Sequence, residues 1–126
     1  MLLSPQVAVS GKYVLISCAD RMMIAVLDGD DLIWQGGIDV DGDVWSPQSS
    51  TAVAFGPNLT VHAFVEKSGT LYYSKGQLDA NKLTVAWSIQ STPVCKGDSV
   101  AAACNGNTLL YAYTVDRTAY WATWSL

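Results

Sequence analysis

One supersecondary pattern occurs three times along the chain and constrains its fold more than any single motif. Each copy contains a short apolar run, a turn, an alternating run, a second turn and a further run rich in apolar or aromatic residues. The copies begin near Val7, Ala52 and Val100. Units of this kind bury their apolar faces by stacking on their neighbours. The 126 residues are therefore predicted to form a single domain built from three similar units.

The runs inside each copy have the two-residue alternation of β-strands. Residues 13–19, 59–65 and 108–115 alternate in this way and are rich in β-branched and aromatic side chains. Turn sequences such as Ser10-Gly11 and Asn105-Gly106 bound these runs. No segment shows a helical period with capping residues, so the chain is predicted to be all-β.

A fourth strand is expected to complete the units. Residues 44–48 and 85–90 both contain a Trp-Ser pair and follow the third strands of the first two copies. The third copy has no such strand after its third run, and residues 2–6 match residues 44–48 in spacing. The repeats are accordingly placed at about 7–48, 52–90 and 100–126, with residues 2–6 as the additional strand.

Four short antiparallel strands in a unit of this length are typical of a β-propeller blade. The runs 53–55, 59–65, 69–74 and 87–88 resemble blades of small lectin-like β-propellers, the fucose-lectin and sialidase-like group. This resemblance implies a carbohydrate-binding, lectin-like module that is multivalent through oligomerisation. The alternative fold is a β-trefoil, which also contains three four-strand repeats. The alternative function is a non-catalytic protein-interaction or assembly scaffold with the same fold.

Repeated polar pairs and surplus aromatic residues supply candidate ligand-binding positions. An acidic-basic pair follows the second strand of every copy, and its side chains can bind sugar hydroxyls or form weak surface ion pairs. The five tryptophans can stack on sugar rings or hold neighbouring sheets together. The candidate ligand-binding residues are Arg21, Trp34, Trp45, Glu66, Lys67, Trp87, Asp116 and Arg117. The arginine cluster that sialidase-type catalysis needs is missing, so no enzymatic activity is predicted.

No cofactor or metal site is predicted. Residues 39–43 carry three alternating carboxylates around a glycine, an arrangement more typical of a polar hairpin loop than of a calcium site. The single histidine, His62, lies in an alternating strand and is predicted to be structural. Cys18, Cys95 and Cys104 have no metal-type spacing, which favours unpaired thiols in a reducing compartment.

The charge pattern and the repeat number limit the possible partners. The net charge is -4 and the basic residues are scattered, which argues against nucleic-acid binding. No apolar run is long enough to span a bilayer, and no signal peptide is visible, so the chain is expected in the cytoplasm or secreted without one. Three blades are too few for a propeller ring. We therefore expect a homodimer with six blades, in which residues 2–6 of each chain complete the third blade of the other.

Overall fold

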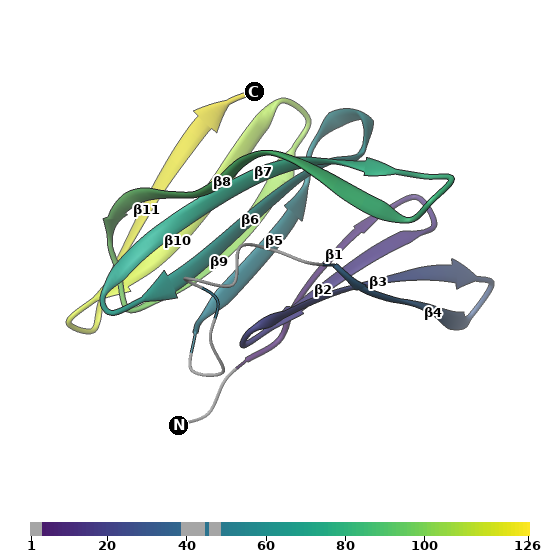
Figure 1. Ribbon diagram of the computed structural model, residues 1–126. Coiled ribbons are helices and arrows are strands. Elements are labelled where there is room, and N and C mark those ends of the chain that lie inside the picture. Colours follow the sequence, from purple (N-terminus) through teal and green to yellow (C-terminus); the bar gives the residue numbers. More distant parts are fainter. Residues whose placement is uncertain (1–3, 39–44, 46–48) are drawn as a thin grey trace.

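The computed structural model describes residues 4–38, 45 and 49–126, and these residues form three antiparallel sheets (Figure 1). The first sheet contains β1 (Gln6–Ser10), β2 (Tyr13–Cys18), β3 (Arg21–Asp28) and β4 (Asp31–Ile38). The second contains β5 (Thr51–Phe55), β6 (Thr60–Lys67), β7 (Thr70–Asp79) and β8 (Thr84–Lys96), with a 3₁₀ turn, Pro57–Leu59, between β5 and β6. The third contains β9 (Ser99–Asn105), β10 (Thr108–Val115) and β11 (Thr118–Ser125). The all-β prediction is confirmed.

Within each sheet, every strand pairs with its neighbours in chain order. Two-residue turns join the second and third strands, and they lie at Ala19-Asp20, Ser68-Gly69 and Asp116-Arg117. Both central residues have positive φ at the second and third of these turns. That conformation matches the right-handed twist of the flanking strands, which explains why short hairpins form here.

These turns correct one feature of the predicted repeat. The acidic-basic pairs do not occupy equivalent places in the three sheets. Glu66 and Lys67 are the last residues of β6, whereas Asp116 and Arg117 are themselves the turn. Asp20 lies in a turn and Arg21 begins β3. Aligning the three copies by their charged pairs therefore puts their strands out of register, because the second strands differ in length.

The fourth strand of the first sheet also differs from its predicted place. It is formed by β4, residues 31–38, while residues 44 and 46–48 lie outside the described part of the chain. Trp45 belongs to no strand and is buried. In the second sheet the prediction for residues 85–90 is confirmed, since they lie within β8. Of the predicted N-terminal strand, Ser4 and Pro5 form no strand, Gln6 begins β1, and the preceding residues are not described.

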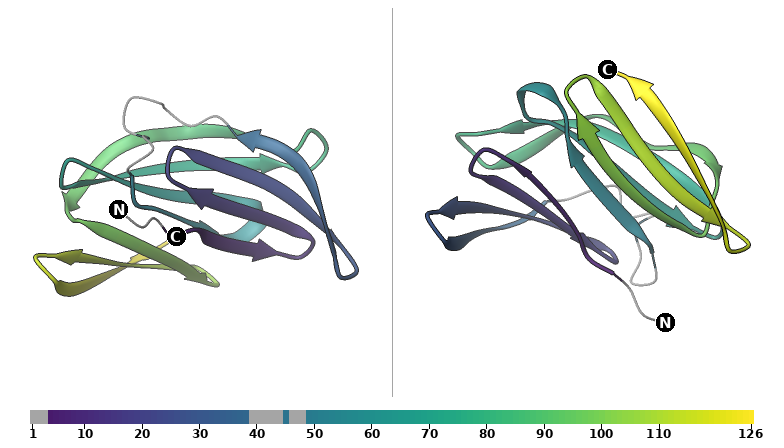
Figure 2. Two further views of the ribbon diagram at one scale, coloured as in Figure 1. Left: turned by 90° about the horizontal axis from the view of Figure 1, so that it is seen from below. Right: turned by 180° about the vertical axis from the view of Figure 1, so that it is seen from behind.

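The three sheets stack face to face, with the second sheet in the middle (Figures 1 and 2). Alternation along β6 sends Val61, Ala63 and Val65 toward the first sheet, where they join a cluster with Leu15 and Ile24. The opposite face of the second sheet packs on the third sheet through a second cluster, which includes Ala52, Phe64, Leu71, Tyr73, Leu109 and Tyr111. The first strands β1, β5 and β9 are neighbours in the stack.

The three sheets are separate in the described residues, and no strand pairing links them into a closed barrel. The closed barrel of a β-trefoil is therefore not observed there. Every described residue from Gln6 to Ile38 and from Thr51 to Ser125 lies in a strand or in a short connection between strands. The described chain therefore consists of three stacked sheets that share two apolar interfaces.

Gly76 in β7 lies where β8 approaches closely. A Cβ atom at this position would lie 2.5 Å from Val85 Cγ1 and 2.9 Å from the carbonyl oxygen of Ala86. We expect Gly76→Ala to lower the free energy of unfolding by about 1–3 kcal/mol, because the backbone must shift to admit the methyl group. Urea denaturation measures this loss. The control is Gly37→Ala in β4, where the nearest atom lies at 3.9 Å and a change within about 0.5 kcal/mol is expected. Equal losses in the two variants would contradict the argument.

Candidate functional site

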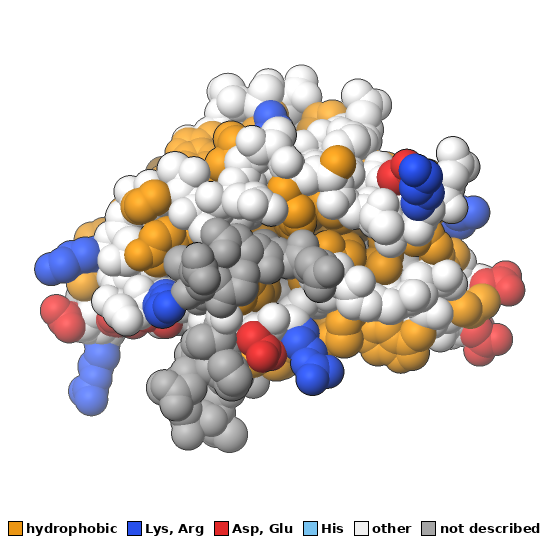
Figure 3. Space-filling model, viewed as in Figure 1, with side chains coloured by type: hydrophobic (Ala, Val, Ile, Leu, Met, Phe, Trp, Pro, Cys, Tyr) orange, Lys and Arg blue, Asp and Glu red, His pale blue; other side chains and the backbone are white. Residues whose placement is uncertain are grey.

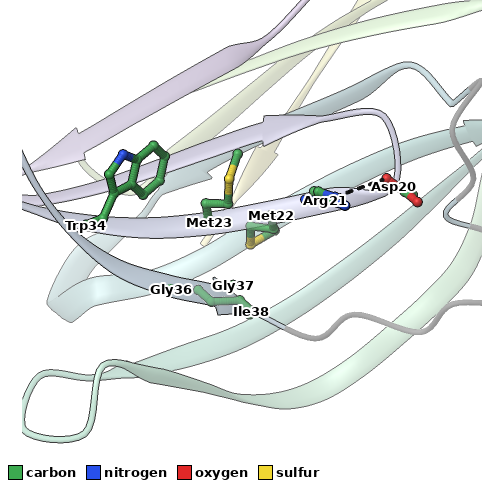
Figure 4. Close-up of a pocket in the computed structure, with 8 residues that line it drawn as sticks. All are labelled: Asp20, Arg21, Met22, Met23, Trp34, Gly36, Gly37 and Ile38. Carbon is green, nitrogen blue, oxygen red and sulfur yellow. Dashed lines mark ion pairs between the residues drawn. The ribbon is translucent and has the colours of Figure 1, made fainter.

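A groove of 440 Å³ lies on the first sheet beside β3 and β4 (Figure 4). It is lined by Asp20, Arg21, Met22, Met23, Trp34, Gly36, Gly37 and Ile38. Figure 4 shows the indole of Trp34 and the side chain of Met23 on the same side of the ribbon, with Met22 on the other. Two predicted site residues, Arg21 and Trp34, are thus brought to one groove from different strands.

The groove exists because β4 itself has glycines at two positions close to Trp34, Gly36 and Gly37. Gly36 pairs with Ile24 and Gly37 with Met23, while Trp34 pairs with Ala25, so the register shifts between them. Gly36 has φ +137°, a conformation that side chains disfavour and that fits a bulge in β4. The shift places the Trp34 ring next to an open floor of backbone.

The charged end of the groove is formed by Asp20 and Arg21. Arg21 Nε lies 3.9 Å from Asp20 Oδ1, and both side chains are substantially exposed. An exposed pair at this separation contributes little to stability. The guanidinium therefore keeps most of its N–H donors for a ligand, and the carboxylate keeps its acceptor oxygens.

The groove combines an apolar wall with polar groups at one end. An exposed indole offers a flat face on which the C–H groups of a sugar ring can stack. Arginine and aspartate side chains next to it can donate to and accept from sugar hydroxyls. The groove contains one carboxylate among its lining residues, Asp20, whereas most glycosidases place two carboxylates around the scissile bond.

The other predicted tryptophans contribute to packing. Trp45 is buried in the cluster between the first and second sheets, and its indole N–H has no hydrogen-bond partner among the described residues. Trp87 in β8 is partly buried and packs against the same cluster. Both indoles therefore pack in the cluster between the first and second sheets, and neither lines the groove.

The remaining predicted residues lie at the ends of hairpins. Glu66 Oε1 accepts a hydrogen bond from the backbone N–H of Gly69 at 2.9 Å, which stabilises the β6–β7 turn. Lys67 ends β6. Asp116 and Arg117 form the β10–β11 turn, where the N–H of Asp116 donates to Asp98 Oδ2 at 3.0 Å. None of these four residues lines the groove.

Six of the eight residues that line the groove are not among the candidates: Asp20, Met22, Met23, Gly36, Gly37 and Ile38. Met23, Gly36 and Gly37 form its side and floor. The sequence signal was the pair of glycines that follows Trp34 inside a strand, since glycine in a strand often marks a bulge or an open surface. Met23 carried no signal of its own, because its exposure depends on the β3–β4 register.

A buried histidine–tyrosine pair lies between the second and third sheets. His62 is fully buried, and its Nδ1 lies 2.7 Å from the hydroxyl of Tyr73. Burial, assisted by the charge of Lys75, lowers the pKa of His62 from 6.5 to about 4. Burial raises the pKa of Tyr73 to about 12. The pair is therefore neutral at pH 7, which agrees with the structural role predicted for His62.

The described residues contain neither a metal-binding cluster nor a disulfide. No group of three or more His, Cys, Asp and Glu side chains able to hold a metal ion occurs among them. Residues 39–43, with their alternating carboxylates, lie outside that part of the chain. Cys18, Cys95 and Cys104 are all partly buried and form no disulfide. No helix in the described residues is long and apolar enough to cross a membrane.

Comparisons of the chain with protein-family models, with curated proteins and with solved structures find no match.

Proposed function

We propose that the three sheets are blades of a β-propeller and that the chain is a carbohydrate-binding, lectin-like module. Three features support the propeller: the sheets are antiparallel in chain order, they stack face to face, and their first strands are neighbours. Propellers arrange four-stranded sheets around a central axis in this manner. The groove beside Trp34 and Arg21 is the proposed sugar site.

The observation that carries the proposal is the exposed Trp34 indole beside a glycine floor, with Asp20 and Arg21 at the end of the groove. A single exposed tryptophan is common on protein surfaces. Its position next to an open floor and a charged pair gives the surface both an apolar wall and hydrogen-bonding groups. Sugars need both, because a pyranose has apolar ring faces and a polar rim.

The same site favours binding without catalysis. A carboxylate pair with the spacing of a glycosidase is missing from the residues that line the groove. We therefore propose a non-enzymatic role, in which several weak sites of an assembled protein act together. The competing function is an interaction scaffold, which the exposed apolar faces of the first and third sheets favour.

Glycan binding tests the proposal directly. We expect the protein to bind members of an array of monosaccharides and oligosaccharides, and the strongest array glycan then serves as the probe for titration calorimetry. Trp34→Ala should weaken binding of that glycan at least about tenfold, because the stacking face is lost. Arg21→Ala should weaken it as well, because guanidinium donors are lost.

The control is Ile33→Ala, which removes an equally exposed neighbour that does not line the groove and should leave the affinity unchanged. Absence of binding across the array at high protein concentration would favour the scaffold. Binding that survives Trp34→Ala would place the sugar site elsewhere.

A further inference from the structure

The two ends of the stack present sheet faces on which large apolar side chains remain exposed. On the first sheet, Val7, Val9 and Trp34 are among the large hydrophobic side chains that remain exposed, and Trp121 is exposed on the third sheet. Figure 3 shows hydrophobic side chains at the surface over the first sheet, with acidic side chains at the tip of its β3–β4 hairpin. Extended apolar faces on a folded domain mark interaction surfaces.

The repeat shows what covers such a face. The fourth residue of the third strand is Ile24 in the first sheet, Tyr73 in the second and Trp121 in the third. Ile24 is 1% exposed and Tyr73 8%, because the next sheet covers each of them, whereas Trp121 is 73% exposed. Trp121 is therefore a core-type residue for which this chain supplies no covering sheet among its described residues.

The outer face of the first sheet, at the opposite end of the stack, also exposes a residue whose equivalent in the next sheet is buried. Val9 pairs with Val14 in the first sheet, and Val53 occupies the corresponding place in the second sheet, where it pairs with Ala63. Val53 is 1% exposed because the first sheet covers it, whereas Val9 is 54% exposed. Among the described residues, the first sheet consequently has no preceding sheet against it, just as the third has no following one.

The two open faces are complementary in the way that the internal faces are. In the internal interfaces, an alanine-bearing first strand packs beside a strand with larger side chains: Ala8 joins the cluster of Val53 and Phe55, and Ala52 joins that of Val100. On the third sheet, Ala101, Ala103 and Ala112 with Leu110 line a shallow apolar hollow of 150 Å³. The protruding Val7 and Val9 of a first sheet are the matching side chains.

We propose that a second copy of this chain covers both faces, with its first sheet on the third sheet of its partner and its third sheet on the partner's first. Two-fold symmetry then forms both interfaces at once and closes a ring of six sheets. The new contacts continue the stacking already made by the two internal interfaces. A second copy is favoured over an unrelated protein because Trp121 on one end face and Val9 on the other occupy positions whose equivalents, Tyr73 and Val53, are covered by another sheet of this chain.

The sugar groove lies at the rim of this interface. Val9, Val14, Ala25 and Trp34 form one row across the first sheet from β1 to β4. Trp34 stands at the outer end of that row, on the last strand. The dimer does not depend on sugar binding, and the two proposals fail separately: one is measured by mass and the other by glycan affinity.

Analytical ultracentrifugation from about 1 to 100 µM tests the proposal. We expect a single species of twice the 13.5 kDa chain mass. Trp121→Asp and Val9→Lys should each raise the dimer dissociation constant at least about thirtyfold, because a central apolar contact is replaced by a buried charge. Ile89→Asp, at an exposed β8 residue on neither end face, should remain a dimer. Circular dichroism and thermal unfolding confirm that each variant is folded.

A mixing experiment separates lost docking from lost folding. Equal amounts of Trp121→Asp and Val9→Lys chains should form heterodimers, because one of the two interfaces then contains neither substitution and the other pairs Asp with Lys. A monomeric native chain, a native mass other than that of two copies, a dimer unaffected by either substitution, or a mixture that stays monomeric would each overturn the proposal.

Discussion

Phe64→Ala is expected to lower the free energy of unfolding by about 3–5 kcal/mol. Phe64 is fully buried in the interface between the second and third sheets. Its ring lies 4.9 Å from that of Tyr111 and 5.2 Å from that of Tyr73, measured between centroids. Truncation leaves a cavity that these large rings, held by their own strands, cannot fill.

Urea denaturation followed by tryptophan fluorescence and by circular dichroism measures the loss, and coincident transitions justify a two-state treatment. The control is Ile89→Ala, which truncates an exposed aliphatic residue of the same sheet and should cost less than about 1 kcal/mol. If Phe64→Ala cost no more than the control, the third sheet would not be packed on the second as described.

Lowering the pH from 7.5 to 4.5 is expected to destabilise the native chain by about 2–3 kcal/mol more than a His62→Gln variant. The pKa of His62 falls from 6.5 to about 4 on folding, because burial disfavours the charged imidazole. The folded state therefore stays neutral where the unfolded state takes up a proton. This contribution to stability is complete above pH 6.5 and is lost as the pH falls toward 4.

The comparison with His62→Gln cancels the effect of other groups that take up protons between pH 7.5 and 4.5. Hydrogen bonds from the backbone N–H groups of Lys82 and Asn81 are the main cause of the lowered pKa of Asp79. Protonation of Asp79 in acid therefore also destabilises the fold, and it does so equally in the native chain and in the variant. Denaturant midpoints across the pH range give the difference curve. Parallel curves for the two proteins would show that His62 is accessible to water and protons in the folded state.

Local features of the fold were predictable because they depend on short stretches of chain. The alternation in 59–65 and 108–115 identified β6 and β10, since a two-residue period places one face of a strand in the core. Turn residues such as Gly11 and Gly106, both with φ +57°, marked the hairpins. The prediction for the fourth strand of the first sheet is wrong: β4 occupies that place, because a Trp-Ser pair does not by itself specify a strand.

The candidate site was only half predictable. Arg21 and Trp34 were selected by residue type, from a repeated charge pair and from a tryptophan outside the repeat. Their proximity depends on the register of β3 against β4 and on the bulge beside Gly36, which no local pattern specifies. Selection by residue type also predicted Trp45 and Trp87 as site residues, but their rings pack between the first and second sheets.

The sequence by itself determined that the chain is all-β and where most strands and turns lie, because these follow from short-range periodicity and turn chemistry. Only the tertiary structure decided which faces are covered. Ile24 and Trp121 occupy equivalent strand positions, yet one is buried and the other exposed. Burial depends on whether another sheet lies against that face, and this is a property of the stack rather than of the residue or its neighbours in the chain.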